Sequence, residues 1–105
     1  MDAPAHLFPD GRTLDNYAPD RFFGAAVAVD LTPCSRKIIR PADLSAYEQQ
    51  IRQAAFCLLC TGWSRYWGKD RYYESYPVLS DDAARWLAQF PLSGVGVDTI
   101  SADAA

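Results

Sequence analysis

Histidine, cysteine and long apolar runs are all scarce in this sequence. The 105 residues include one histidine, His6, and three cysteines. A catalytic zinc site usually needs about three protein ligands, so one imidazole cannot complete such a site alone. No apolar run approaches the roughly 20 residues that a membrane helix needs. The amino terminus also lacks the basic and then apolar segments of a secretory signal. We therefore expect a protein that does not cross a membrane.

A strong charge of one sign is lacking too. The ten basic residues are scattered along the chain, and the net charge is −3. Nucleic-acid-binding proteins carry a basic patch or stripe, so the sequence argues against nucleic acid as a partner. The odd number of cysteines, with no secretory signal, favours reduced thiols and a cytoplasmic location.

Two of the cysteines have the spacing of a redox or metal motif. Cys57 and Cys60 lie inside a continuous apolar run, which predicts a strand rather than a turn. Residues three apart on a strand point to opposite faces of the sheet. We therefore do not expect these two thiols to form a working pair, and the third cysteine is Cys34.

The pattern of apolar residues predicts a single α/β domain over residues 1–105. Half of the residues are apolar, which is enough for a core. Predicted strands and helices alternate, and this order favours an α/β fold. Strands are predicted at 25–31, 37–40, 55–61 and 94–99. Amphipathic helices are predicted at 42–52 and from the capping Ser80 to Pro91.

Between these elements lie two long irregular segments. Residues 7–23 carry turn signals and scattered aromatic residues, and we interpret them as an arm. It is either a surface loop pinned by its aromatic residues or, as the family resemblance described below implies, a segment that packs over a metal site and contributes to a dimer. Residues 63–76 form a loop rich in aromatic residues. Loops at the carboxyl ends of parallel strands build the sites of α/β proteins. Trp63 and Trp67 are therefore candidates for binding a planar substrate ring, although aromatic residues also anchor loops and interfaces.

The amino terminus holds a pair of candidate metal ligands. Asp2 lies four residues before His6, with Pro4 between them. Carboxylate and imidazole are ligands that suit zinc, manganese or iron. The spacing alone is common, and it also fits an exposed terminal loop.

The segment from Asp2 to Gly11 resembles the cyclase family of metal-dependent hydrolases, which includes bacterial kynurenine formamidase and isatin hydrolase. The family signature is His-x-Gly-Thr-His-x-Asp-Ala-Pro-x-His, and this chain matches it from the residue before Asp2 to His6. Residues 61–68 and 94–103 also resemble that family. Family members usually carry a basic residue where Cys60 stands.

The resemblance implies a partial swivelling β/β/α fold, truncated at both ends, with a long amino-terminal arm and an aromatic loop. It implies hydrolysis of an amide or cyclic amide with a divalent metal, zinc or manganese. Asp2 would be a shared or bridging metal ligand, and His6 a ligand or the proton carrier. The family's other ligands would lie before Met1 and after Ala105. We therefore expect little or no activity from the chain alone.

Three hypotheses follow for the function. The chain is a truncated arylformamidase-like hydrolase that acts on a small amide substrate, with Met1 an internal methionine of a longer reading frame. Alternatively, two chains pool Asp2 and His6 into one site at a twofold axis. In the third, the chain is a non-enzymatic remnant that associates with itself or a partner through the aromatic loop. If the chain is active, we expect a small-molecule amide substrate, and we also expect a homo-oligomer.

Overall fold

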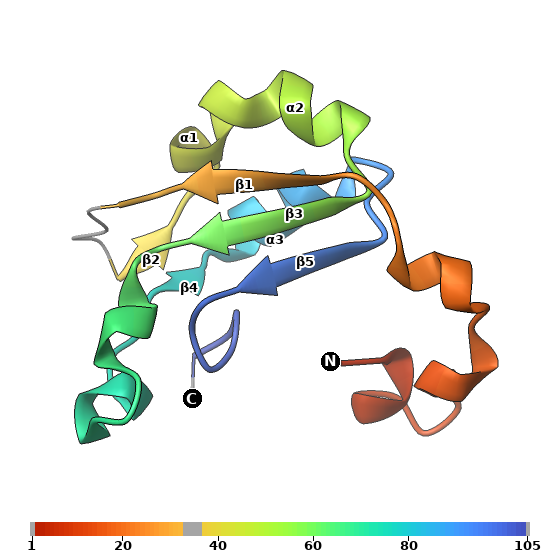
Figure 1. The fold of residues 1–105 in the computed structure, drawn as a ribbon, viewed down its shortest axis with the longest axis horizontal. Helices are drawn as coiled ribbons and strands as arrows, with labels where there is room; N and C mark the ends of the chain where they lie inside the picture. The colour runs from red at the N-terminus through yellow and green to blue at the C-terminus, as the bar shows by residue number, and fades with distance from the viewer. Residues whose placement is uncertain (1, 33–36, 105) are drawn as a thin grey trace.

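The protein is a mixed α/β molecule with two small parallel sheets. The computed structural model describes residues 2–32 and 37–104, and Figure 1 shows their arrangement. A three-stranded sheet consists of β1 (Ala26–Asp30), β3 (Phe56–Cys60) and β5 (Gly94–Val97), in the spatial order β1-β3-β5. The α/β class expected from the sequence is therefore confirmed.

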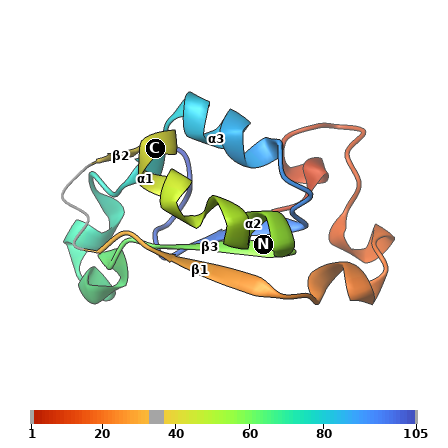
Figure 2. The same ribbon diagram turned by 90° about the horizontal axis from the view of Figure 1, so that it is seen from above.

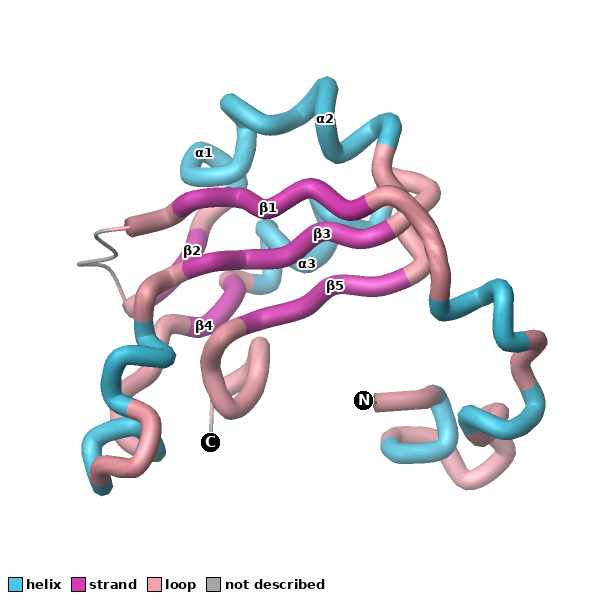
Figure 3. The backbone as a smooth tube through the Cα atoms, viewed as in Figure 1, coloured by secondary structure: helices cyan, strands magenta, loops and turns pink. Residues whose placement is uncertain are grey.

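The register of the large sheet aligns the carboxyl ends of its strands. Ala28 is opposite Leu58, which in turn is opposite Gly96. Both strand pairs are parallel, so β1 and β3 are each followed by a crossover that returns the chain to the amino-terminal end of the sheet. The residues that follow β1, β3 and β5 consequently meet at one edge, as Figure 3 shows.

A second sheet contains two short strands, β2 (Ile38–Ile39) and β4 (Val78–Leu79), which are also parallel. The sequence predicts the first of these strands but not the second. Val78 and Leu79 give too short a pattern to show a period of two. Their strand is defined by its pairing with β2 and by the bond from the Leu79 N–H to the Ala102 carbonyl, 2.9 Å.

The helix predicted over 42–52 is interrupted. The structure has α1 (Pro41–Leu44), a 3₁₀ turn (Ser45–Tyr47) and α2 (Glu48–Gln53). The Ser45 hydroxyl donates a hydrogen bond to the Ala42 carbonyl at 3.1 Å, and such back-bonding competes with regular helix geometry. The predicted inward face is nevertheless correct, because Leu44 and Ile51 are fully buried.

The last helix, α3 (Asp81–Ala88), follows the sequence prediction closely. The Ser80 hydroxyl accepts a hydrogen bond from the Ala83 N–H at 3.0 Å, as expected of a helix cap. Ala83 and Leu87 on its inner face contact the same core as Ile51. α1, α2 and α3 all lie on one side of the large sheet, as Figure 2 shows from above.

The core therefore lies on one face of the sheet. Val29, Cys57 and Leu59 are at most 1% exposed and face the helices. The alternate residues Ala26 and Ala28 are exposed. The prediction of a buried strand over 25–31 thus holds for only one side of β1. Within residues 2–32 and 37–104, no helix is long and apolar enough to cross a bilayer.

The amino-terminal arm contains three 3₁₀ turns, at Pro4–His6, Leu14–Asn16 and Pro19–Phe22. The arm joins the sheet at the amino-terminal end of β1 and extends away from it in Figure 1. Most of its large apolar side chains are exposed, including Leu7 (75%), Phe8 (62%) and Phe23 (77%). The arm is therefore not pinned to the sheet by these side chains.

Candidate functional site

The Asp98 carboxylate joins two segments at the carboxyl edge of the large sheet, and we call its three hydrogen bonds to Thr61 and Gly62 the clamp. Asp98 follows β5, and its Oδ1 accepts hydrogen bonds from the backbone N–H of Thr61 at 3.1 Å and from the Thr61 hydroxyl at 2.6 Å. Its Oδ2 accepts a hydrogen bond from the Gly62 N–H at 2.8 Å. One side chain thus joins the end of β5 to the first residues of the loop that follows β3.

The clamp continues into the aromatic loop. The Thr61 hydroxyl oxygen accepts a hydrogen bond from the Trp63 N–H at 3.2 Å, and the Trp63 indole Nε1 donates to the Tyr72 carbonyl at 3.0 Å. Gly62 has a φ of +82°, which few other residues adopt without strain, and a Cβ there would lie 3.0 Å from the Thr32 methyl group. The loop's entry is therefore fixed by backbone geometry and hydrogen bonds together.

The aromatic loop, residues 63–76, contains two 3₁₀ turns, Trp63–Tyr66 and Asp70–Tyr73. Trp63 packs edge to face on Tyr66 with 4.7 Å between the ring centroids. Trp67 packs edge to face on Tyr72 at 5.2 Å, yet remains 72% exposed. Of the two predicted ring-binding residues, Trp63 is therefore largely held by its own loop, whereas Trp67 presents its ring to solvent.

The loop also has a cationic side. The guanidinium groups of Arg65 and Arg71 lie 4.8 Å and 4.3 Å from the centroid of the Tyr66 ring. A hydrogen bond from Arg65, together with the positive charges of Arg65, Arg71 and Lys69, lowers the pKa of the Tyr66 phenol. An anionic group would be favoured next to these two guanidinium groups.

A second carboxylate at this edge, Asp30, makes a local turn. Its Oδ1 accepts hydrogen bonds from the Thr32 hydroxyl and from the Thr32 N–H, the latter at 2.9 Å. These two hydrogen bonds lower the pKa of the exposed Asp30 carboxyl. Asp30 thus stabilises the turn that the sequence predicts after the first strand.

Asp2 and His6 lie on the arm, away from the carboxyl edge. Both are exposed, and in Figure 1 the arm and the aromatic loop lie at opposite ends of the strands. Among the residues that the structure describes, no three His, Cys, Asp or Glu side chains gather closely enough to hold a metal ion. The donor set of one chain therefore does not fit the divalent metal that the family resemblance implies.

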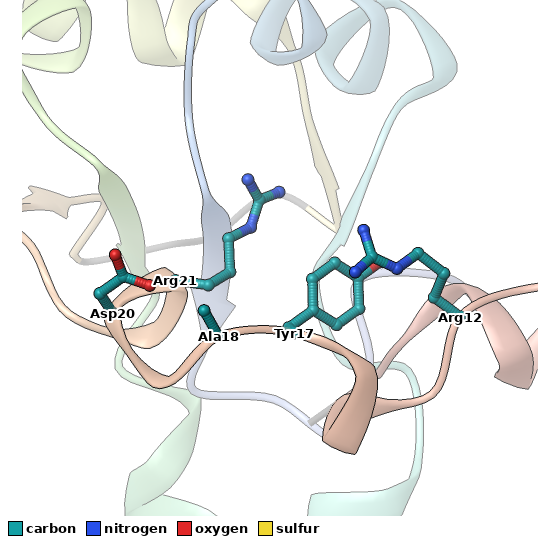
Figure 4. Close-up of a pocket in the computed structure, with 5 residues that line it drawn as sticks. All are labelled: Arg12, Tyr17, Ala18, Asp20 and Arg21. Atoms are coloured by element: carbon teal, nitrogen blue, oxygen red, sulfur yellow. The ribbon is translucent and has the colours of Figure 1, made fainter.

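Elsewhere on the surface, the residues that the structure describes line at least two hollows. One, of about 570 Å³, is in the arm and is lined by Arg12, Tyr17, Ala18, Asp20 and Arg21. Figure 4 shows Arg12 beside the Tyr17 ring, with 4.3 Å between the guanidinium carbon and the ring centroid. The other is an apolar groove of about 320 Å³ between α3 and β5. None of the four predicted site residues lines either hollow.

The two described cysteines are free thiols in different environments. Cys57 is buried in the core, whereas Cys60 is partly exposed. Burial, with a smaller contribution from Cys60, raises the pKa of the Cys57 thiol and keeps it protonated at neutral pH. Cys34 lies outside the described residues.

Sequence reasoning did not identify the bonds between Thr61 and Asp98. Both residues come directly after predicted parallel strands, so their proximity could have been inferred. The strand order β1-β3-β5, which makes β3 and β5 neighbours, is not visible in the sequence.

The fold and this edge define an α/β protein whose loops converge at the carboxyl ends of parallel strands. The sequence model of the Cyclase family, described as "Putative cyclase", matches residues 1–104, and the chain belongs to this family. An uncharacterized protein of Haemophilus influenzae is 29% identical over an aligned length of 103 residues, and the match covers 92% of this chain and 72% of the relative. No solved structure gives a significant match.

Proposed function

We propose that the chain acts on an amide or cyclic amide bond of a small aromatic substrate, as part of a hydrolase of the Cyclase family. The observation that carries the proposal is the family match over residues 1–104, which includes the Asp2-Ala3-Pro4-Ala5-His6 segment. The family's name indicates ring-forming or ring-opening chemistry, and an amide bond is the substrate class that the resemblance implies.

The aromatic loop is the proposed binding surface for the substrate ring. The exposed face of Trp67 offers edge-to-face or offset stacking, which contributes about 0.5–1.5 kcal/mol beyond area burial. The guanidinium groups of Arg65 and Arg71, which lie over the Tyr66 ring in the same loop, favour a carbonyl oxygen or a carboxylate on the ligand. The clamp from Asp98 holds the start of the loop in place for binding.

His6 is the proposed proton carrier, since it is the only imidazole in the chain. An imidazole titrates near neutral pH and can pass a proton to a leaving nitrogen. In one chain, however, Asp2 and His6 lie on the exposed arm. Among the described residues, no third metal-ligating side chain joins them to complete a site. We therefore expect slow turnover, and far less than one tightly bound zinc or manganese ion per chain.

The test is hydrolysis of an aryl formamide by the purified chain with added zinc or manganese. The proposal predicts a rate above that of buffer with the same metal. Trp67→Ala should raise KM at least threefold, while Glu74→Gln, an exposed control in the same loop, should leave KM unchanged. Rates equal to those of buffer with both metals would contradict the proposal.

A second candidate is a non-enzymatic module that associates with itself or a partner through the aromatic loop. The exposure of Trp67 (72%) and Tyr73 (60%) favours it, because exposed aromatic rings are common at interfaces. It predicts that Trp67→Ala reduces the mass of the protein in solution, whereas substrate binding predicts an unchanged mass.

A further inference from the structure

The hollow in the amino-terminal arm has two arginine side chains beside one tyrosine ring. The hollow has a volume of about 570 Å³. The guanidinium carbons of Arg12 and Arg21 lie 4.3 Å and 5.8 Å from the centroid of the same Tyr17 ring. In Figure 4 both guanidinium groups are on the same side of the arm's backbone as this ring. We call this hollow, with its two positive charges, the arginine hollow.

Local contacts orient the side chains of the arginine hollow. The Arg12 guanidinium donates a hydrogen bond to the Asn16 carbonyl. The half-buried Tyr17 ring packs edge to face on Phe22, with 6.3 Å between the ring centroids. A guanidinium has five N–H donors, so the bond to Asn16 leaves other donors of Arg12 for a ligand. Arg12 and the ring are therefore placed before any ligand arrives.

The backbone at Arg12 is fixed by a close contact within the arm. The Ala5 N–H donates a hydrogen bond to the Arg12 carbonyl at 3.1 Å. A Cβ added at Gly11 would lie 2.3 Å from the Pro4 carbonyl carbon, so only glycine allows the two segments to approach this closely. The arginine hollow is thus joined to the turn Pro4–His6 by main-chain contacts rather than by a flexible loop.

No carboxylate of the protein neutralises the two arginines. Within residues 2–32 and 37–104, neither Arg12 nor Arg21 forms an ion pair. The neighbouring Asp15 carboxylate accepts a hydrogen bond from the Thr13 hydroxyl in its own turn. Asp20 lines the hollow, but its carboxylate points away from the tyrosine ring in Figure 4. The two guanidinium groups repel each other, and an anion between them would relieve this repulsion.

We propose that the arginine hollow binds the oxyanion group of a small molecule, either a phosphate or a carboxylate. The planar fork of a guanidinium matches the oxygens of both groups and forms paired, charge-assisted hydrogen bonds with them. The volume of the hollow is within the range of small-molecule sites, so it can also hold the organic part of such a ligand. This binding does not depend on the chain being a hydrolase.

Another arginine of the chain provides a matched control. The Arg52 guanidinium also lies over an aromatic ring, 5.3 Å from the Phe90 centroid, but it pairs with the Glu48 carboxylate at 3.5 Å. Arg52 carries the same charge as Arg21 and does not line the hollow. Replacing either one by glutamine changes the net charge equally, so the comparison separates a site from a general effect of charge.

The test is a titration of the full chain with inorganic phosphate, and separately with succinate, followed by two-dimensional ¹H–¹⁵N NMR. Sodium chloride keeps the ionic strength constant at pH 7.5. Both guanidinium groups are exposed, so we expect weak but saturable shifts in residues 12–21, with a Kd on the order of 1 mM. The dianion that binds more tightly identifies the ligand as a phosphate or a carboxylate compound.

Two variants decide whether the arginine hollow is the site. Arg21→Gln should weaken binding at least fivefold, and far-UV circular dichroism verifies that it folds. Arg52→Gln should stay within twofold of the unchanged protein. The proposal is overturned if neither anion gives saturable shifts in residues 12–21 at about 20 mM, or if the two variants weaken binding equally. Shifts confined to residues 65–71 would also overturn it, because they would place the anion on the aromatic loop.

Discussion

The carboxylate of Asp98 makes the sharpest prediction about the candidate site. In Asp98→Asn the side chain keeps one acceptor oxygen, and its NH₂ group meets a donor, because all three hydrogen-bonding partners of Asp98 are donors. A hydrogen bond to a charged group contributes about 1.5–3 kcal/mol. The substitution removes one such hydrogen bond and also the negative charge that strengthens the bonds that remain. It should therefore lower the free energy of unfolding by about 2–3 kcal/mol.

The measurement is urea unfolding followed by far-UV circular dichroism, with Trp fluorescence to report on the loop that contains Trp63. Glu74→Gln removes an exposed charge from the same loop and should change stability by less than about 0.5 kcal/mol. Thr61→Val removes the hydroxyl that donates to Asp98. The double variant should then show a coupling of at least about 1 kcal/mol with Asp98→Asn.

Two outcomes would refute the reasoning. A loss below about 0.5 kcal/mol for Asp98→Asn would mean that solvent replaces the three bonds at little cost. Strict additivity of the Asp98 and Thr61 substitutions would mean that the two side chains do not act together. In either case the clamp would not be what holds the aromatic loop to the sheet.

Three other predictions concern groups outside the clamp. The carboxyl of Asp30 should titrate below the usual aspartate pKa of about 4 by NMR, and Thr32→Val should raise that midpoint. Because the folded pKa is lowered, the stability from Asp30 is present above about pH 4 and is lost as the pH falls through the lowered value. With the third cysteine replaced, Cys60 should react with a thiol reagent at pH 7 at least tenfold faster than Cys57, because the Cys57 pKa is raised by burial. Equal labelling rates for the two thiols would contradict the burial of Cys57. The contribution of the protonated Cys57 to the free energy of unfolding should fall as the pH rises above about 8.5. Leu59→Ala should cost about 2–5 kcal/mol in urea unfolding, since Leu59 is 1% exposed, and a loss under about 1 kcal/mol would show that the site collapses freely.

Local signals in the sequence predict much of this fold correctly. Ser80 caps α3 because a hydroxyl before two aspartates and an apolar stripe is a strong start signal. The continuous apolar run around Cys57 predicts β3, because such runs favour buried strands. The break between α1 and α2 depends on a back-bond from Ser45, and no pattern of apolar residues reports such a bond. β4 exists only through its pairing partners.

The candidate site was predictable in its parts but not in its arrangement. The aromatic loop and the residues after β3 and β5 are visible in the sequence, and they meet at one edge as parallel strands require. The separation of His6 from that edge depends on the path of the arm. The arm's exposed phenylalanines fix no position against the sheet. The uncovered face of β1 was also not predictable, because an apolar run predicts burial on both sides.

The most direct test of the proposed function is the hydrolysis of an aryl formamide by the unchanged chain and by His6→Gln, with the same zinc or manganese concentration in both assays. If the only imidazole carries the proton, kcat/KM should fall at least tenfold in His6→Gln, with folding unchanged by circular dichroism. Equal kcat/KM values for the two proteins would contradict the assignment of this chain to amide hydrolysis through His6.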